Sequence, residues 1–295
     1  MSPQIIFSDV DGTLLNSDHK VLPGTLYAIR ELQDKCVPFV IISGRSPSGI
    51  RPILQENGFT CPMICYSGAL ILDEDEKILY SEGFSRDMAQ KMIQFIESNH
   101  LDCTWNIYSQ DTWIVKDCAD QRVKREESIV HARATEGAAS DLPPDAKVGK
   151  LLCMCNPDKI IEIEHLLKET FPSMSIARSS DMLLEIMKEG VSKRTGVLTM
   201  CRLLNISVEN AVAFGDHYND IEMLETVGCP YLMGNAPEEL KDRFSNITAG
   251  NDDEGIYQAL VRTGIICETG GIPIVLHDGS CRLLPTDKNR QGGRL

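Results

Sequence analysis

Short, uninterrupted runs of apolar residues recur along the chain, and each ends abruptly at small, acidic or amide residues. The clearest runs lie at 5–7, 37–42, 63–66, 211–214 and 231–233. Because apolar and polar residues do not alternate within them, these runs predict strands that are buried on both faces of a parallel sheet. The segments between them space their apolar residues as helices do. Strands that alternate with helices predict an α/β fold built on a doubly wound, mostly parallel sheet.

Polar residues with reactive or hydrogen-bonding side chains follow four of these runs. Asp9, Ser43, Asp216 and Asn235 each stand within two residues of the end of a run. In a doubly wound sheet, the ligand crevice lies beyond the carboxyl ends of the strands. We therefore expect these four side chains to line one crevice.

The middle of the chain, residues 84–187, has a different pattern. It predicts strands at 103–108, 112–116, 150–155, 173–177 and 183–187, and helices at 87–98 and 158–170. We interpret it as a second α/β domain inserted into a core formed by residues 1–83 and 188–268. Residues 269–295 form an extension rich in glycine, in which 272–276 resemble a strand and the last ten residues have a disordered composition.

Composition and charge narrow the classes of function. The 295 residues are 42% hydrophobic and 24% charged, as is typical of a globular protein. A formal net charge of −14 disfavours unassisted binding to nucleic acid or to an anionic membrane. We see neither a secretory signal nor an apolar run long enough to span a bilayer. We expect a cytoplasmic protein with no nucleic-acid or membrane partner.

The eleven cysteines include no C-x-x-C pair, so their spacing lacks the paired ligands of a zinc site. Cys153 and Cys155 alternate within an apolar run. We interpret the cysteines as small buried side chains in a reducing compartment.

The sharpest chemical feature is Asp9-Val10-Asp11-Gly12-Thr13, directly after the first predicted strand. On an extended chain, residues two apart point the same way, so the Asp9 and Asp11 carboxylates can face one site. Two neighbouring carboxylates repel each other unless a cation or a proton lies between them. A hard divalent cation such as Mg²⁺ suits such a pair. One carboxylate can then act as a nucleophile and the other as a general acid and base. A solvated Asp-Gly turn is the alternative interpretation.

Two further acidic residues, Asp216 and Asp220, stand at a later strand end in Gly215-Asp216-His217-Tyr218-Asn219-Asp220. Being four residues apart, they would share one helix face if this loop opens a helix. Carboxylates also stabilise a helix N-terminus without any further role. We interpret His217 as a spacer.

Two other motifs offer groups for binding phosphate. Lys193 follows Gly190-Val191-Ser192 at the start of a predicted helix, where the helix dipole disfavours a positive charge. Its position is explained if the ammonium group reaches a phosphate or the acidic residues. Ser43-Gly44-Arg45 offers a hydroxyl and backbone N–H groups beyond a strand, which can bind phosphoryl oxygens. An ordinary strand-to-helix turn is the alternative for Ser43.

In chain order, the four motifs are Asp-x-Asp-Gly-Thr, Ser-Gly-Arg, the lysine and Gly-Asp-x-x-Asn-Asp. This order resembles the haloacid dehalogenase-like phosphatase superfamily. The residues at 11–16, 190–193 and 233–236 are similar to its Cof-type branch, which carries a C2-type cap, and those at 251–256 are similar to the usual ending of that branch. The resemblance covers residues 4–266 and implies a Rossmann-like core with residues 84–187 as a mobile cap. One departure is Ser67-Gly68-Ala69, where the branch usually has Asn-Gly-Ala.

The resemblance also implies a role for each motif. Asp9 would be the nucleophile that forms an aspartyl-phosphate, Asp11 the general acid and base, and Lys193 the catalytic cation. The groups that hold the phosphoryl moiety would be Ser43, Gly44, Lys193 and Asn219. The Mg²⁺ site would consist of Asp9, the main-chain carbonyl of Asp11 and Asp216, with Asp220 supporting either the metal site or Lys193.

The function expected from these roles is Mg²⁺-dependent hydrolysis of a small phosphomonoester metabolite, with a sugar phosphate as the first choice. A phosphomutase similar to the phosphomannomutases is an alternative, and a non-catalytic phosphometabolite-binding protein is another. The identity of the substrate, the oligomeric state and the role of the extension stay open.

Overall fold

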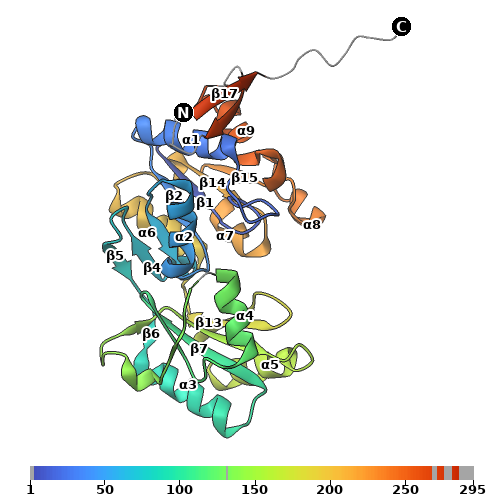
Figure 1. Cartoon of the computed structure of the whole chain (residues 1–295). Coiled ribbons are helices and arrows are strands. Elements are labelled where there is room, and N and C mark those ends of the chain that lie inside the picture. The colour runs from blue at the N-terminus through green and yellow to red at the C-terminus, as the bar shows by residue number, and fades with distance from the viewer. Residues whose placement is uncertain (1–2, 131, 268–270, 276–280, 286–295) are drawn as a thin grey trace. The chain divides into compact units, whose positions relative to one another are not determined.

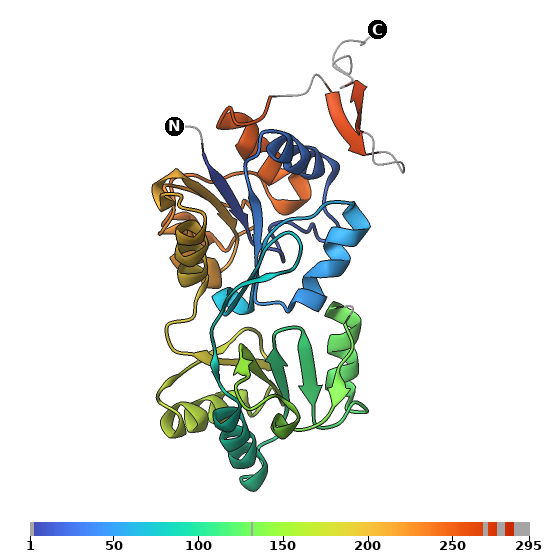
Figure 2. The same cartoon turned by 90° about the vertical axis from the view of Figure 1, so that its left-hand side faces the viewer.

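The computed structural model describes residues 3–130, 132–267, 271–275 and 281–285, the last two segments by their backbone alone (Figure 1). The disorder expected for the last ten residues falls on positions outside the described residues. The strand expected at 272–276 is observed as β16 (Gly271–Val275), which pairs antiparallel with β17 (Cys281–Pro285), as Figure 2 shows.

A seven-stranded sheet carries the strands predicted from the apolar runs. In spatial order they are β15 (Cys229–Leu232), β14 (Ala211–Gly215), β1 (Ile5–Ser8), β2 (Phe39–Ile42), β3 (Met63–Cys65), β4 (Leu70–Leu72) and β5 (Ile78–Ser81). The pairs β15/β14, β14/β1 and β1/β2 are parallel, whereas β3/β4 and β4/β5 are antiparallel. Every residue of β1, β2 and β14 is buried, which explains their uninterrupted apolar sequences. The predicted α/β class with a sheet rich in parallel pairs is confirmed.

Helices alternate with the strands of this sheet. Outside residues 84–187 they are α1 (Pro23–Asp34), α2 (Pro47–Asn57), α6 (Lys193–Leu203), α7 (Ile221–Leu224), α8 (Glu238–Lys241) and α9 (Gly255–Arg262). Helices α1 and α9 lie side by side, and the rings of Tyr27 and Tyr257 meet edge to face at 6.3 Å between centroids (Figure 1 and Figure 2). Among the described residues, no helix is both long enough and apolar enough to cross a membrane.

The N-terminus of α1 is capped by a residue from far along the chain. The Glu254 carboxylate accepts hydrogen bonds from the backbone N–H groups of Gly24 (2.6 Å) and Thr25 (2.8 Å). These groups have no partner within the helix, and a carboxylate is favoured at the positive end of the helix dipole. Glu254 therefore joins the segment before α9 to the start of α1.

The structure divides into two compact units. Within the residues described above, the first unit comprises Met1–Ile41, Ile53–Cys61 and Cys201–Leu295, and the second comprises Ile42–Pro52 and Pro62–Met200. The second unit contains all of residues 84–187 and, in addition, strands β3 to β5. The expected division into a core at 1–83 and 188–268 and an inserted domain at 84–187 stays a prediction.

A six-stranded sheet forms the centre of the second unit. Its order is β12 (Met174–Arg178), β13 (Leu183–Lys188), β11 (Lys150–Cys155), β7 (Cys103–Ser109), β8 (Thr112–Val115) and β9 (Thr135–Glu136). Its helices are α3 (Arg86–Ser98), α4 (Gln121–Val130) and α5 (Ile160–Thr170), and a short antiparallel pair joins β6 (Phe84–Ser85) to β10 (Lys147–Val148). The five strands and two helices expected here are observed to within two residues.

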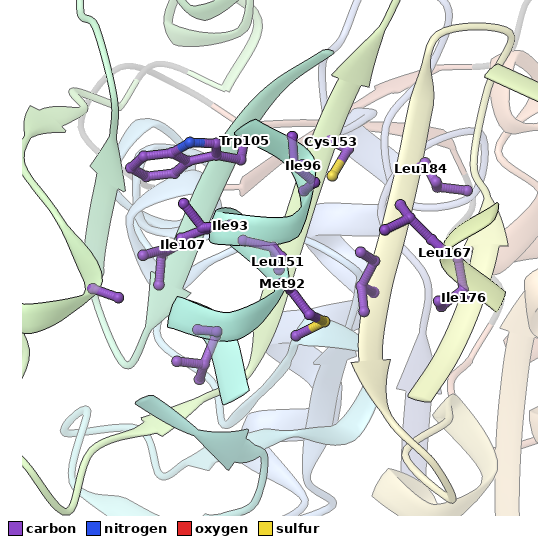
Figure 3. Packing of buried hydrophobic residues seen from close by; sticks show 14 of the residues in the cluster. Met92, Ile93, Ile96, Trp105, Ile107, Leu151, Cys153, Leu167, Ile176 and Leu184 are labelled. Carbon is purple, nitrogen blue, oxygen red and sulfur yellow. The ribbon is translucent and has the colours of Figure 1, made fainter. Parts of the chain in front are cut away.

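One face of this sheet packs against α3 and α5. Met92, Ile93 and Ile96 of α3 meet Trp105, Ile107 and Leu151 of the sheet, and Leu167 of α5 lies near Ile176 and Leu184 (Figure 3). Residues two apart along a strand point to the same face of the sheet, so Trp105 and Ile107 of β7 share the face that α3 covers. Helix α4 was not expected, because Val123 is the one fully buried residue in its sequence.

The Glu254 cap makes a testable contribution to stability. Replacing Glu254 with alanine removes the acceptor for two helix N–H groups, and we expect the free energy of unfolding to fall by about 1–2 kcal/mol. Urea denaturation measures it. The control is Glu31→Ala in the same helix, where a pair with Lys35 at 3.5 Å should contribute less than about 0.5 kcal/mol. Equal losses in the two variants would contradict the capping role.

Candidate active site

Parallel pairing places Asp9 and Asp216 at the same edge of the sheet. Strands β1 and β14 are neighbours in parallel register, with Ser8 opposite Phe214, and the Asp9 N–H donates to the Phe214 carbonyl at 3.0 Å. Asp9 is the first residue after β1, and Asp216 is the first residue after β14. Because the two strands end together, side chains 207 positions apart in the sequence meet. The expected proximity of Asp9 and Asp216 is therefore observed.

Asp9, Asp216 and Asp220 form a compact group of buried carboxylates. One carboxylate oxygen from each residue lies within 4.8 Å of those of the other two. Three carboxylates removed from water repel one another, which raises the free energy of the site unless positive charge compensates them. A donor set made of oxygen atoms alone suits a hard divalent cation such as Mg²⁺ and suits thiolate-seeking metals poorly. The residues present therefore fit the expected metal.

Asp220 reaches this group by a different route from the helix face that the sequence suggested. It ends a short 3₁₀ turn, Tyr218–Asp220, and α7 begins after it. Its Oδ2 accepts the N–H groups of Asp216 and His217, both at 3.0 Å, so the loop folds back on itself. Asp220 is completely buried. The side chain therefore also organises the backbone that carries Asp216.

Gly12 allows the loop after β1 to pass close to Asp216. Its φ of +82° lies in the left-handed region, and a Cβ at this position would collide with the Asp216 carboxylate. Both constraints favour glycine. The next residue, Thr13, is buried, and its hydroxyl donates to Asp216 Oδ1 at 2.9 Å. The Asp-Gly-Thr sequence thus brings a hydrogen-bond donor to the acidic group.

Asn235 is a site residue whose role the sequence did not reveal. Its Nδ2 donates to the Gly12 carbonyl at 2.9 Å and lies 3.4 Å from Asp216 Oδ2. Its Oδ1 accepts the N–H of Asn251 at 3.0 Å, and Asn251 Nδ2 donates to the Leu15 carbonyl at 2.9 Å. The position of Asn235 after an apolar run predicted that it lines the crevice, but it did not indicate which residues it contacts. Asn235 and Asn251 together brace the loop that follows Asp9.

Asp11 and Asn219 occupy more open positions. Both residues are exposed, and the buried carboxylate group does not include the Asp11 side chain. The ligand expected from Asp11 is its main-chain carbonyl, so that role stays a prediction. His217 is exposed as well, and its interpretation as a spacer stays a prediction.

In the second unit, Ser43 and Gly44 form a tight loop after β2. Ser43 is buried, its N–H donates to the Ile64 carbonyl at 2.9 Å, and its Oγ accepts the Arg45 N–H at 3.2 Å. The Gly44 carbonyl accepts a hydrogen bond from Lys150 Nζ at 2.8 Å. The sequence provided no signal for the contact between Lys150 and this loop.

Lys193 is the first residue of α6 and is 2% exposed. Ser192 before it caps the helix: its Oγ accepts the Thr195 N–H at 3.5 Å, and its own N–H donates to Thr195 Oγ1 at 3.0 Å. An ammonium group is rarely buried without polar or charged partners. Lys193 therefore belongs to the interior and not to the solvated surface, and its role at the site stays a prediction.

A charged group lies beside the Ser43-Gly44 loop within the second unit. Lys150 is buried and pairs with Glu185 at 3.2 Å, and its Nζ lies 5.3 Å from the centroid of the Tyr108 ring. Burial raises the pKa of Glu126, and the positive charge of Lys150 offsets part of this rise. Burial also raises the pKa of Tyr108 well above its ordinary value.

Three large side chains of the second unit have structural partners. Trp105 and Trp113 are both buried. Arg122 pairs with Asp120 at 2.8 Å, and its hydrogen bonds lower the pKa of that carboxyl group to about 2.

Comparisons with known proteins agree with this fold. Residues 6–260 match the family model of the haloacid dehalogenase-like hydrolases. The chain belongs to that family, as its motifs predicted, and it is an enzyme of the phosphatase class.

Individual relatives extend over most of the chain. It is 34% identical to a Haemophilus influenzae protein provisionally named a phosphatase, over 87% of this chain and 96% of that protein. It is 25% identical to the Escherichia coli pyridoxal phosphate phosphatase YbhA, over 88% and 97% respectively. Among solved structures, a haloacid dehalogenase-like hydrolase from Bacteroides thetaiotaomicron superposes with a TM-score of 0.80 at 25% identity, covering 89% of this chain and 100% of that one.

The close approach of Gly12 to Asp216 can be tested by adding one methyl group. We expect Gly12→Ala to lower the free energy of unfolding by about 1–3 kcal/mol more than Gly58→Ala does, because Gly58 has a left-handed φ of +63° but open space around it. Urea denaturation in the presence of EDTA measures both losses without a contribution from metal. Equal losses would show that backbone strain alone explains the glycine.

Proposed function

We propose that this protein hydrolyses phosphomonoesters with the help of Mg²⁺, through an aspartyl-phosphate on Asp9. The observation that supports this proposal best is the buried group formed by Asp9, Asp216 and Asp220 at the ends of two adjacent parallel strands. A buried carboxylate next to a site for a divalent cation is suited to attack an electrophilic phosphorus atom. Membership of the phosphatase class supports the same reaction.

In the first step, a carboxylate oxygen of Asp9 attacks the phosphorus and the bond to the leaving oxygen breaks. Asp11 donates a proton to that oxygen, so the alcohol leaves as a neutral molecule. In the second step, water attacks the phosphorus of the aspartyl-phosphate, Asp11 accepts a proton from this water, and inorganic phosphate leaves.

The metal site is proposed to consist of Asp9, the Asp11 main-chain carbonyl and Asp216, with Asp220 in support. When bound, Mg²⁺ would neutralise charge on the carboxylates and on the phosphoryl oxygens. The Thr13 hydroxyl and the Asn235 amide would orient the Asp216 carboxylate, as their hydrogen bonds indicate.

The phosphoryl group is proposed to bind to Ser43, Gly44, Lys193 and Asn219. Lys193 supplies a buried positive charge, which interacts more strongly with an anion than an exposed one does. Ser43 supplies a hydroxyl, and Gly44 supplies a backbone N–H group in the loop after β2.

The substrate is proposed to be a small phosphorylated metabolite, with sugar phosphates as the first class to test. Residues 84–187 are proposed to act as a cap that selects the leaving group. One relative is named a pyridoxal phosphate phosphatase, so the screen should contain that ester too. Release of inorganic phosphate, as opposed to transfer to a second sugar, distinguishes a hydrolase from a mutase. The cytoplasmic location stays a prediction.

The nucleophilic role of Asp9 predicts a large kinetic effect. Asp9→Asn retains the shape of the side chain but removes the charge that attacks phosphorus, and we expect kcat to fall by about 10³-fold or more. Release of phosphate from an activated aryl phosphate measures kcat. Asp18→Asn, at an exposed position in the following loop, is the control and should leave kcat unchanged. A folded Asp9→Asn protein that retains more than about a tenth of kcat would rule out covalent catalysis by Asp9.

The metal site predicts a thermal effect that does not depend on catalysis. Binding of Mg²⁺ to the native state should raise Tm, because a ligand at 100 times its Kd stabilises that state by about 2.7 kcal/mol. Asp216→Asn should abolish the difference in Tm between Mg²⁺ and EDTA. Asp252→Asn, where the exposed side chain binds Ser17, should preserve it. Stabilisation and activity with Zn²⁺ but not with Mg²⁺ would contradict the assignment.

A further inference from the structure

Three cysteines gather at one end of two paired strands in the second unit, apart from the residues proposed for catalysis. Cys103 is the first residue of β7, Cys155 is the last residue of β11, and Cys153 precedes it by two positions. Cys153 lies on the face of the sheet that α3 covers (Figure 3), and residues two apart on a strand share a face. All three thiols are free.

The register places Cys103 directly opposite Cys155. Asn156 N–H donates to the Asp102 carbonyl at 3.0 Å, whereas the Cys155 N–H points away from β7 and donates to the Met182 carbonyl at 2.7 Å. This pattern makes Cys103 and Cys155 a non-hydrogen-bonded antiparallel pair, in which the Cα atoms are about 4.5 Å apart and the side chains are at their closest. A disulfide requires about 4.4–6.8 Å between Cα atoms. An antiparallel pair of this kind falls within that range.

Cys153 does not fit this geometry. It lies opposite Trp105, so its relation to Cys103 is diagonal. Diagonal neighbours are about 7–8 Å apart between Cα atoms, beyond the range that a disulfide spans. The Cys153 thiol also hydrogen-bonds to Cys103, but the backbone register favours Cys155 as the partner of Cys103 in a disulfide.

The two thiols of the pair differ in access and in acidity. Cys103 is half-buried, whereas Cys155 is fully buried. Hydrogen bonds from Cys153 and Cys155, helped by the positive charge of Arg122, lower the pKa of Cys103 to about 4, and the same interaction raises the pKa of Cys155. Thiolates are the forms that peroxides oxidise. Cys103 is thus the thiol that reacts first, and Cys155 the one placed to resolve it.

We propose that a hydroperoxide converts Cys103 and Cys155 into a cross-strand disulfide between β7 and β11. In the first step, the Cys103 sulfur attacks a peroxide oxygen, the O–O bond breaks, and a sulfenic acid forms as the alcohol leaves, or water when the oxidant is H₂O₂. In the second step, the Cys155 sulfur attacks the Cys103 sulfur, the S–S bond forms and water leaves. The two thiols lose two electrons in total, and the peroxide accepts them.

The experiment treats the full chain with H₂O₂, blocks the remaining thiols, and maps the disulfides by proteolysis and mass spectrometry. We expect one intramolecular link that joins the peptides of Cys103 and Cys155 and that dithiothreitol reverses. Cys153→Ser should still form it, whereas Cys155→Ser should instead accumulate oxidised Cys103. Cys118→Ser is the control, because Cys118 is also half-buried in the second unit but burial raises its pKa. This variant should behave like the wild-type protein.

Three results would overturn the proposal: a link between Cys103 and Cys153, a link between two chains in place of the internal one, or no disulfide at all. A second measurement does not depend on any variant. In the reduced wild-type protein, iodoacetamide at pH 6 should modify Cys103 before the other cysteines, and prior oxidation should protect it. Faster modification of any other cysteine would contradict the assigned role of Cys103.

Discussion

Electrostatic repulsion among three buried carboxylates is the constraint around which the first unit is organised. Asp9, Asp216 and Asp220 approach one another within 4.8 Å because two parallel strands end side by side. Their mutual repulsion would drive the three carboxylates apart if other interactions did not hold them in place. Donors surround them: the Thr13 hydroxyl for Asp216, and backbone N–H groups for Asp220. Such hydrogen bonds stabilise buried negative charge.

Many of the other residues around these carboxylates hold the backbone in place and take no part in the proposed reaction. Gly12 and Gly215 stand where a Cβ would collide with Asp216 and Asp220 respectively. Asn235 and Asn251 hold the loop after β1, and Glu254 joins the same segment to the N-terminus of α1. The segment that contains Asn251 and Glu254 has no proposed role in the reaction, but it helps to hold the loop that follows Asp9.

The second unit is built on a mainly antiparallel sheet with its own covered face, and three of its thiols show how a fold can bring ordinary core residues together. Cys103, Cys153 and Cys155 pack as small apolar side chains within the core. The antiparallel register nevertheless sets one pair of them opposite each other and sets the third on a diagonal. The same hydrogen-bonding pattern that builds the sheet decides which sulfurs can meet.

The sequence by itself determined the α/β class, the main strands and the family, because these depend on local patterns: uninterrupted apolar runs, helical spacing and short motifs at strand ends. It did not reveal α4, whose sequence buries little apolar surface, or the 3₁₀ turn that brings Asp220 to Asp216. Only the tertiary structure decided the partners of Asn235, the capping of α1 by Glu254, the contact between Lys150 and Gly44, and the pairing of Cys103 with Cys155. Each of these depends on strand order and register between segments far apart in the chain, and a local pattern carries no information about which distant residue will lie opposite it.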